Sequence, residues 1–139
     1  MILYMDYEFW NAIIIFIIGL LHCLVVNTYR FLRGSEQTYL DGKLFTVSID
    51  QHEQLITGWK VGHFLNYFAI GLLAPNYWYL GILLGILAEI MEMIGSRYFT
   101  FISPNMIGDT IINTIGIICG LAVSQITGLK MDIVKTFRI

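Results

Sequence analysis

Two carboxylates lie inside the apolar run "LLGILAEIMEMIGSRYF", residues 83–99. They are Glu89 and Glu92, and Arg97 follows them near the end of the run. A charged side chain at the centre of a bilayer costs at least roughly 2.5–3.5 kcal/mol, so such groups usually face the interior of a helix bundle. If this run crosses a membrane, the two glutamates are predicted to face a polar pocket.

Two other apolar runs carry polar residues near one end. The run that starts at Trp59 carries Lys60, His63, Asn66 and Tyr67, and the run that follows Pro104 carries Asp109 and Asn113. If consecutive runs cross a membrane in alternating directions, all these residues come to one face, which we name side B. Side A is the face that holds the N-terminus. We therefore expect three helices to contribute to one pocket near side B.

Helical periodicity places polar and small residues of each run on a common face. In the run that starts at Trp59, this face carries His63, Tyr67 and Ala74. In the next run it carries Gly81, Gly85, Ala88 and Glu92, with Glu89 at the flank. In the run that follows Pro104 it carries Asp109, Asn113, Gly116 and Gly120. Small residues four apart let helix backbones approach closely in lipid. The pattern predicts a tight waist toward side A that opens into a polar pocket toward side B.

The residue types in this pocket allow three kinds of chemistry. Carboxylates and an imidazole can act as general acids and bases, or they can bind a divalent cation through oxygen ligands. Cationic side chains at the rim can hold the phosphate of a lipid. Because the spacing matches no zinc signature, the metal ligands stay undetermined and no cofactor is assigned, with a divalent cation as an open alternative. The candidate catalytic residues are His63, Glu89, Glu92 and Asp109, and the candidate substrate-binding residues are Lys60, Tyr67, Arg97 and Asn113.

A purely structural role is the competing interpretation of the same residues. Intramembrane polar groups can pair with one another and only fix the packing of helices. The pairs would be Glu92 with Lys60, Glu89 with Arg97, and Asp109 with Asn113. The convergence of three acids, a histidine, two amides and two cations on one side favours a functional pocket.

The composition indicates a membrane protein. The chain has 139 residues, of which 57% are hydrophobic and 13% are charged, with a mean hydropathy of +0.71; a soluble domain carries about 25% charged residues. We predict an all-α, polytopic membrane protein with four transmembrane helices in a bundle, forming a single domain over residues 1–139. The expected spans cover residues 9–29, 59–74, 77–94 and 105–127.

The loop between the first two spans is expected to contain a short hairpin. Asp41-Gly42 lies between short apolar stretches, which is typical of a hairpin turn. Further on, Asp50 with Glu53 three residues later fits a capping box, which predicts a short helix that leads into the second span.

Partners and orientation follow from the charges. No basic run suggests nucleic acid, so the expected partners are membrane lipids and, in the alternative interpretation, other membrane-protein subunits. Side B holds five cations and side A three, which favours a cytoplasmic location for residues 30–58 and 95–103. Cys23 and Cys119 lie in apolar runs and are expected to be packing residues.

Three motifs in these runs resemble the VanZ-like family of small integral membrane proteins. They are "K-x2-H-F-x2-Y" at Lys60, His63, Phe64 and Tyr67, "E-x2-E" at Glu89 and Glu92 followed by Arg97, and "D-x3-N-x2-G-x3-G" at Asp109, Asn113, Gly116 and Gly120. The likeness covers about residues 58–124, and the family usually has Gln where this chain has Glu92. The resemblance implies a four-to-five-helix membrane domain and a connection with the cell envelope or lipid-linked intermediates.

Three functions follow as hypotheses. The first is a side-B pocket that binds or processes a polar lipid headgroup or a lipid-linked phosphate. The second is a non-catalytic structural or accessory subunit of a larger membrane assembly. The third is passage of protons or ions along the carboxylates, which the expected closure of the side-A half by glycine-mediated packing disfavours.

Overall fold

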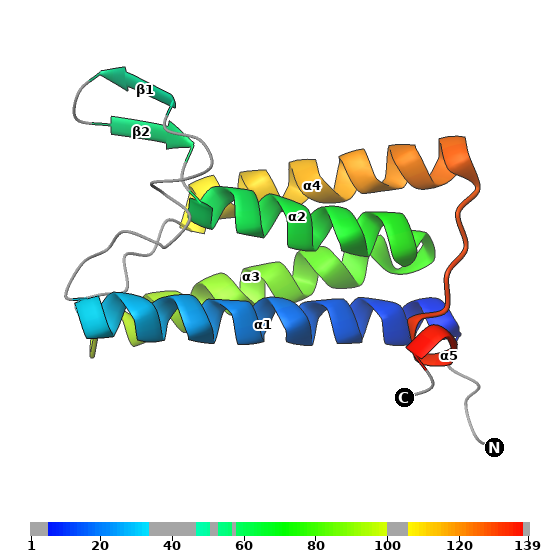
Figure 1. Ribbon diagram of the computed structural model, residues 1–139, viewed down its shortest axis with the longest axis horizontal. Helices are drawn as coiled ribbons and strands as arrows, with labels where there is room; N and C mark the ends of the chain where they lie inside the picture. Colours follow the sequence, from blue (N-terminus) through cyan, green and yellow to red (C-terminus); the bar gives the residue numbers. More distant parts are fainter. Residues whose placement is uncertain (1–5, 34–46, 51–52, 57, 100–105, 138–139) are drawn as a thin grey trace.

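The structure, a computed structural model, describes residues 6–33, 47–50, 53–56, 58–99 and 106–137. Four long helices make up most of it, with two short strands, a 3-10 turn and a terminal helical segment (Figure 1). In chain order the elements are α1 (Tyr7–Arg33), β1 (Val47–Asp50), β2 (Glu53–Ile56), α2 (Gly58–Leu73), η1 (Pro75–Tyr77), α3 (Trp78–Gly95), α4 (Met106–Thr127) and α5 (Ile133–Phe137).

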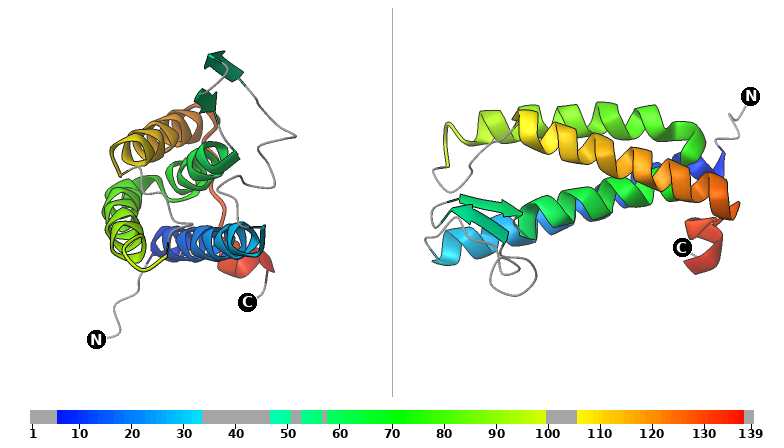
Figure 2. Two further views of the ribbon diagram at one scale, coloured as in Figure 1. Left: turned by 90° about the vertical axis from the view of Figure 1, so that its left-hand side faces the viewer. Right: turned by 90° about the horizontal axis from the view of Figure 1, so that it is seen from above.

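The four long helices lie side by side and alternate in direction. α1 and α3 run one way and α2 and α4 run the other way (Figures 1 and 2). The start of α1, the end of α2, the start of α3 and the end of α4 therefore share one end of the bundle, which corresponds to side A. The strand pair and the opposite helix ends lie toward side B, as the alternation in the sequence predicts.

Three of these helices are long and apolar enough to cross a membrane. The segments are Tyr7–Leu32, Pro75–Gly95 and Met106–Thr127. α2 has 16 residues, which corresponds to about 24 Å of helix, whereas the hydrocarbon core of a bilayer is about 30 Å thick. The chain is thus compatible with a multi-pass membrane protein, and the predicted span at 59–74 is seen as a helix of nearly those bounds.

The helix ends follow the expected punctuation where they are described. α2 ends just before Pro75, which begins the 3-10 turn η1. Gly128 has a φ of 62° directly after α4, and its N–H donates to the Ser124 carbonyl oxygen at 2.9 Å. This left-handed position is one that glycine adopts without steric cost, which explains why α4 ends at Thr127.

The segment before α2 differs from the prediction. Glu53–Ile56 is not the start of a helix but strand β2, which pairs antiparallel with β1. An acidic residue followed by Glu three positions later fits a helix start, but here Asp50 and Glu53 face each other across the strand pair. The hairpin predicted at Asp41-Gly42 lies outside the described residues.

Close contact between α2 and α4 depends on glycines. A Cβ atom on Gly116 would lie 2.7 Å from the Phe64 carbonyl oxygen, and one on Gly120 would lie 2.8 Å from the Leu72 nitrogen and still closer to the Phe68 carbonyl oxygen. From the other side, a Cβ on Gly71 would collide with the Ile117 carbonyl oxygen. The two backbones touch, which confirms the predicted small-residue packing for this pair.

The face of α3 that is buried differs by a small rotation from the predicted one. Its buried residues are Gly81, Gly85 and Glu89, whereas Ala88 and Glu92 are half-buried. A Cβ on Gly85 would lie 3.0 Å from the Tyr67 hydroxyl oxygen, so this glycine makes room for a side chain of α2 rather than for its backbone. Glu89, which was expected at the flank of the predicted face, is therefore more deeply buried than Glu92.

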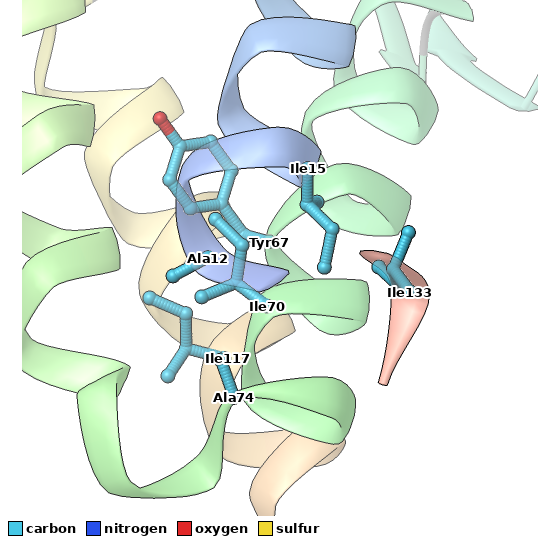
Figure 3. Packing of buried hydrophobic residues seen from close by; sticks show 7 residues of the cluster. All are labelled: Ala12, Ile15, Tyr67, Ile70, Ala74, Ile117 and Ile133. Carbon is cyan, nitrogen blue, oxygen red and sulfur yellow. The ribbon is translucent and has the colours of Figure 1, made fainter. Parts of the chain in front are cut away.

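An apolar core fills the bundle toward side A. Seven buried residues from α1, α2, α4, α5 and the position directly after α2 form it; Ile70 of α2, Ala74 just after α2 and Ile117 of α4 are at most 1% exposed (Figure 3). Most of the long apolar side chains on the outer faces are exposed, as expected for helices in lipid. The seven residues of the apolar core are Ala12, Ile15, Tyr67, Ile70, Ala74, Ile117 and Ile133.

Replacing Gly120 by Ala is expected to destabilise the bundle by about 1–3 kcal/mol, because the added methyl group has no room against α2. Thermal unfolding in mild detergent measures the effect. Ala122→Leu on the exposed face of the same helix is the control and should unfold like the wild type. Equal unfolding temperatures for Gly120→Ala and the wild type would show that α2 and α4 are not in backbone contact.

Candidate functional site

Three helices bring an imidazole and two carboxylates together near side B. His63 of α2, Glu89 of α3 and Asp109 of α4 each offer a ligand atom, and these atoms lie within 4.8 Å of one another. Glu89 and Asp109 are each 1% exposed. Together with the neighbouring Asn113 they form what we name the polar cluster. Four of the eight predicted site residues thus meet in one buried place.

Hydrogen bonds tie the cluster to α2 and α4. His63 Nδ1 lies 3.0 Å from Asn113 Oδ1 and 4.0 Å from Glu89 Oε1. Trp59 Nε1 donates to Asp109 Oδ2 over 3.3 Å. Trp59 and His63 are one turn apart on α2, and Asp109 and Asn113 are one turn apart on α4, so both contacts follow from the alignment of these two helices.

Within the described part of the chain, every member of the polar cluster still has a polar atom without a hydrogen-bond partner. These atoms are His63 Nε2, Glu89 Oε2, Asp109 Oδ1 and Asn113 Nδ2, and all are buried. Among the described residues two further buried polar side-chain atoms lack a partner, Asn27 Oδ1 and Arg30 Nε, both in the side-B half of α1. Leaving a buried polar group unpaired costs roughly 1–3 kcal/mol, so the side-B half is arranged at the expense of stability.

The first helix adds residues that sequence reasoning did not assign to the site. Arg30 is 8% exposed, and its guanidinium carbon lies 4.8 Å from the centre of the Trp59 ring. Cys23 brings its sulfur within 4.8 Å of ligand atoms on His63 and Glu92. Cys23 and Arg30 are seven residues apart, which puts them on one helix face. This spacing was the one sign in the sequence that the two residues could act together. The sequence does not show which face of α1 meets the polar cluster.

The other predicted residues lie around the cluster. Tyr67 is 4% exposed and its ring stacks with that of His63 at 6.4 Å between centroids. Glu92 is half-buried beside Cys23 and His63. Lys60 is half-buried in the first turn of α2, whereas Arg97 is exposed in the turn after α3.

Two of the three pairs expected of a purely structural network, Asp109 with Asn113 and Glu89 with Arg97, are not formed among the described residues. Asp109 accepts a hydrogen bond from Trp59 rather than from Asn113, whose amide nitrogen has no partner. Glu89 approaches His63, and its Oε2 atom is unpaired. The acids of the cluster are therefore not neutralised as a closed network would require.

At side A, in contrast, buried polar residues are well satisfied. Asn11 is 0% exposed; its amide donates to the Leu73 and Met131 carbonyl oxygens at 2.8 and 2.6 Å, and its oxygen accepts from the Ile133 nitrogen at 3.0 Å. Glu8 accepts two hydrogen bonds from Asn76 at 2.8 and 3.1 Å. These contacts join four elements, and they show what structural polar residues look like in this protein.

The contrast predicts opposite stability effects at the two ends. Asn11→Ala is expected to lower the free energy of unfolding by about 2 kcal/mol or more, because it removes three hydrogen bonds and strands buried backbone groups. Glu89→Gln should leave stability unchanged or raise it, because it removes a buried charge with an unpaired oxygen. Thermal unfolding in detergent measures both, with the exposed Gln125→Ala as the baseline. A loss for Glu89→Gln as large as that for Asn11→Ala would make the cluster structural.

Comparison with known proteins returns no match. No protein-family model matches the chain, and no curated protein and no solved structure matches it. The resemblance of the motifs on α2, α3 and α4 to VanZ-like proteins accordingly stays a prediction.

Proposed function

We propose that this protein is an integral membrane protein whose side-B pocket binds a polar, phosphate-bearing lipid headgroup. The observation that carries the proposal is the set of unpaired polar atoms on His63, Glu89, Asp109 and Asn113. A ligand with its own donors and acceptors would supply the missing partners. The VanZ-like motifs, which include all four residues, agree with a role at lipid-linked intermediates.

A buried cation beside the cluster, Arg30, supports an anionic ligand. Arg30 is linked to Asp109 through Trp59, which lies under the guanidinium and donates to the carboxylate. Its Nε atom is buried and has no hydrogen-bond partner among the residues that the structure describes. Because a guanidinium is always charged and can bind phosphate oxygens in a bidentate manner, Arg30 is the proposed phosphate contact. Lys60 and Arg97 remain predicted contacts at the rim, and His63, Glu89, Glu92 and Asp109 the predicted catalytic residues.

A lipid ligand also fits the position of the pocket. The cluster lies near the side-B ends of helices whose outer faces expose long apolar side chains. A headgroup can reach such a site while its acyl chains stay in the bilayer. The charge bias between the two ends favours side B as the cytoplasmic face.

The proposal includes four membrane crossings. α1 and α3 run in the same direction (Figure 1), and Asn76 in η1, just before α3, bonds to Glu8 at the start of α1. If both helices span, the chain must cross back between them, and α2 is the long helix described in that interval. Packing against α4 covers the polar face of this shorter helix.

Cysteine labelling tests the four crossings. Asp6→Cys and Asn76→Cys, each in a background with Cys23 and Cys119 replaced by serine, should react with an impermeant maleimide from the same side of sealed vesicles. Tyr98→Cys should react from the opposite side. Labelling of positions 6 and 76 from opposite sides would mean that α2 does not cross.

Native mass spectrometry after extraction in mild detergent tests headgroup binding. The wild type should retain a phospholipid, and Arg30→Gln should reduce retention about tenfold or more, because hydrogen bonds to charged groups contribute roughly 1.5–3 kcal/mol. Lys130→Gln makes the same charge change at the exposed side-A end and should have no effect. Equal retention by wild type, Arg30→Gln and Asp109→Ala would refute the proposal.

The alternative functions are weaker on the same observations. A structural subunit has no need for unpaired buried acids, and the well-satisfied residues at side A show how this chain builds polar packing. Recovery only as a large complex with stoichiometric partner chains and no lipid would favour that alternative. Ion passage requires a path through Ile70, Ala74 and Ile117, which close the side-A half (Figure 3).

A further inference from the structure

We propose that His63, Glu89 and Asp109 form a binding site for one divalent transition-metal ion, with the Asn113 amide oxygen as a fourth ligand. The inference deepens the proposed headgroup site and rests on it in one respect: the ion would take the unpaired oxygens of Glu89 and Asp109 with or without a lipid, and the headgroup phosphate would then reach the cluster through the ion and Arg30. The inference is carried by the distances among these side chains and by the carboxylate oxygens Glu89 Oε2 and Asp109 Oδ1, which have no hydrogen-bond partner among the described residues.

The ligand atoms already converge. One atom each of His63, Glu89 and Asp109 lie within 4.8 Å of one another, and Asn113 Oδ1 is 3.0 Å from His63 Nδ1. Ligands about 2.0–2.2 Å from a metal are separated from each other by roughly 3–4 Å. Only small side-chain rotations are needed to close the site around an ion.

Charge balance selects a divalent ion. Glu89 and Asp109 are both 1% exposed, and neither has a lysine or arginine as its described hydrogen-bond partner. Two carboxylate anions in a low-dielectric interior must take up protons, pair with a cation or coordinate a metal. One divalent cation neutralises both, and it gives the unpaired oxygens Glu89 Oε2 and Asp109 Oδ1 a partner within reach.

The donor set indicates the kind of ion. One imidazole nitrogen with carboxylate and amide oxygens suits Zn²⁺ or Mn²⁺ better than Mg²⁺ or Ca²⁺, which prefer all-oxygen ligands. Metal on Nδ1 requires the imidazole proton to sit on Nε2. Coordination positions left open by the protein can accept an oxygen of the phosphate held by Arg30, which places the ion between the acids and the anionic ligand.

A second trio, Cys23, His63 and Glu92, also has ligand atoms within 4.8 Å of one another. It shares His63 with the proposed site, so one ion at His63 could in principle use either set. The Cys23 and Glu92 side chains are only half-buried, and neither has a buried atom without a partner among the described residues. The buried set is therefore the one we assign.

Metal content of the full chain tests the site. Protein purified in mild detergent without a polyhistidine tag, stripped with EDTA and reloaded with Zn²⁺ alone, should retain one ion per chain after desalting. Asp109→Asn and Glu89→Gln should weaken Zn²⁺ binding at least tenfold. Glu8→Gln, which changes a buried but fully paired carboxylate at side A, should bind like the wild type.

Two further variants separate this site from its rivals. Arg30→Gln should keep the metal even where it loses the lipid, so failure of headgroup binding and failure of metal binding can be told apart. Cys23→Ser should also keep the metal. Loss of Zn²⁺ in Cys23→Ser together with its retention in Asp109→Asn would overturn the assignment in favour of the second trio.

A spectroscopic measurement on the wild type tests the metal site even if a variant fails to fold. Mn²⁺ bound to the stripped protein should show a pulsed-EPR coupling to one imidazole nitrogen. Absence of that coupling, or no retained Zn²⁺ in the wild type, would overturn the proposal.

Discussion

The backbones of α2 and α4 touch at Gly71, Gly116 and Gly120, and the position of each functional side chain follows from that contact. With the two helices in this register, His63 meets Asn113 and Trp59 meets Asp109. α3 then packs on this pair, with glycines that accept side chains of α2, and delivers Glu89. A larger residue at these glycines would separate the helices and open the cluster.

The two ends of the bundle treat buried polarity in opposite ways. At side A, Asn11 and Glu8 of α1 form hydrogen bonds with polar groups of neighbouring elements, and these bonds join α1 to α2, η1 and α5. At side B, the polar cluster keeps unpaired atoms in an interior where each of them costs stability. Proteins retain such unpaired buried atoms where a bound ligand supplies the missing partners. The side-A half therefore stabilises the bundle, and the side-B half is organised for binding.

Helical periodicity was sufficient to predict much of this arrangement. The stripe of Asp109, Asn113, Gly116 and Gly120 is buried as expected, because four-residue spacing fixes one face of a helix. Periodicity wrongly placed Glu92 on the packing face and Glu89 at its flank, because two residues three apart lie on overlapping faces and only packing decides which of them is buried. The strand at Glu53–Ile56 was missed because the spacing of Asp50 and Glu53 fits both a helix start and a tight strand pair. Arg30 and Cys23 were missed because single residues on an apolar helix do not indicate which neighbour they face.

The most direct test of the account is an experimental structure of the protein extracted together with its native lipids. We expect density for a bound ligand at the polar cluster, in contact with Glu89 Oε2 and Asp109 Oδ1 and with the Arg30 side chain turned toward it. A structure in which these atoms pair with the protein's own side chains, and in which no space is left between them, would contradict the claim that the polar cluster is a binding site.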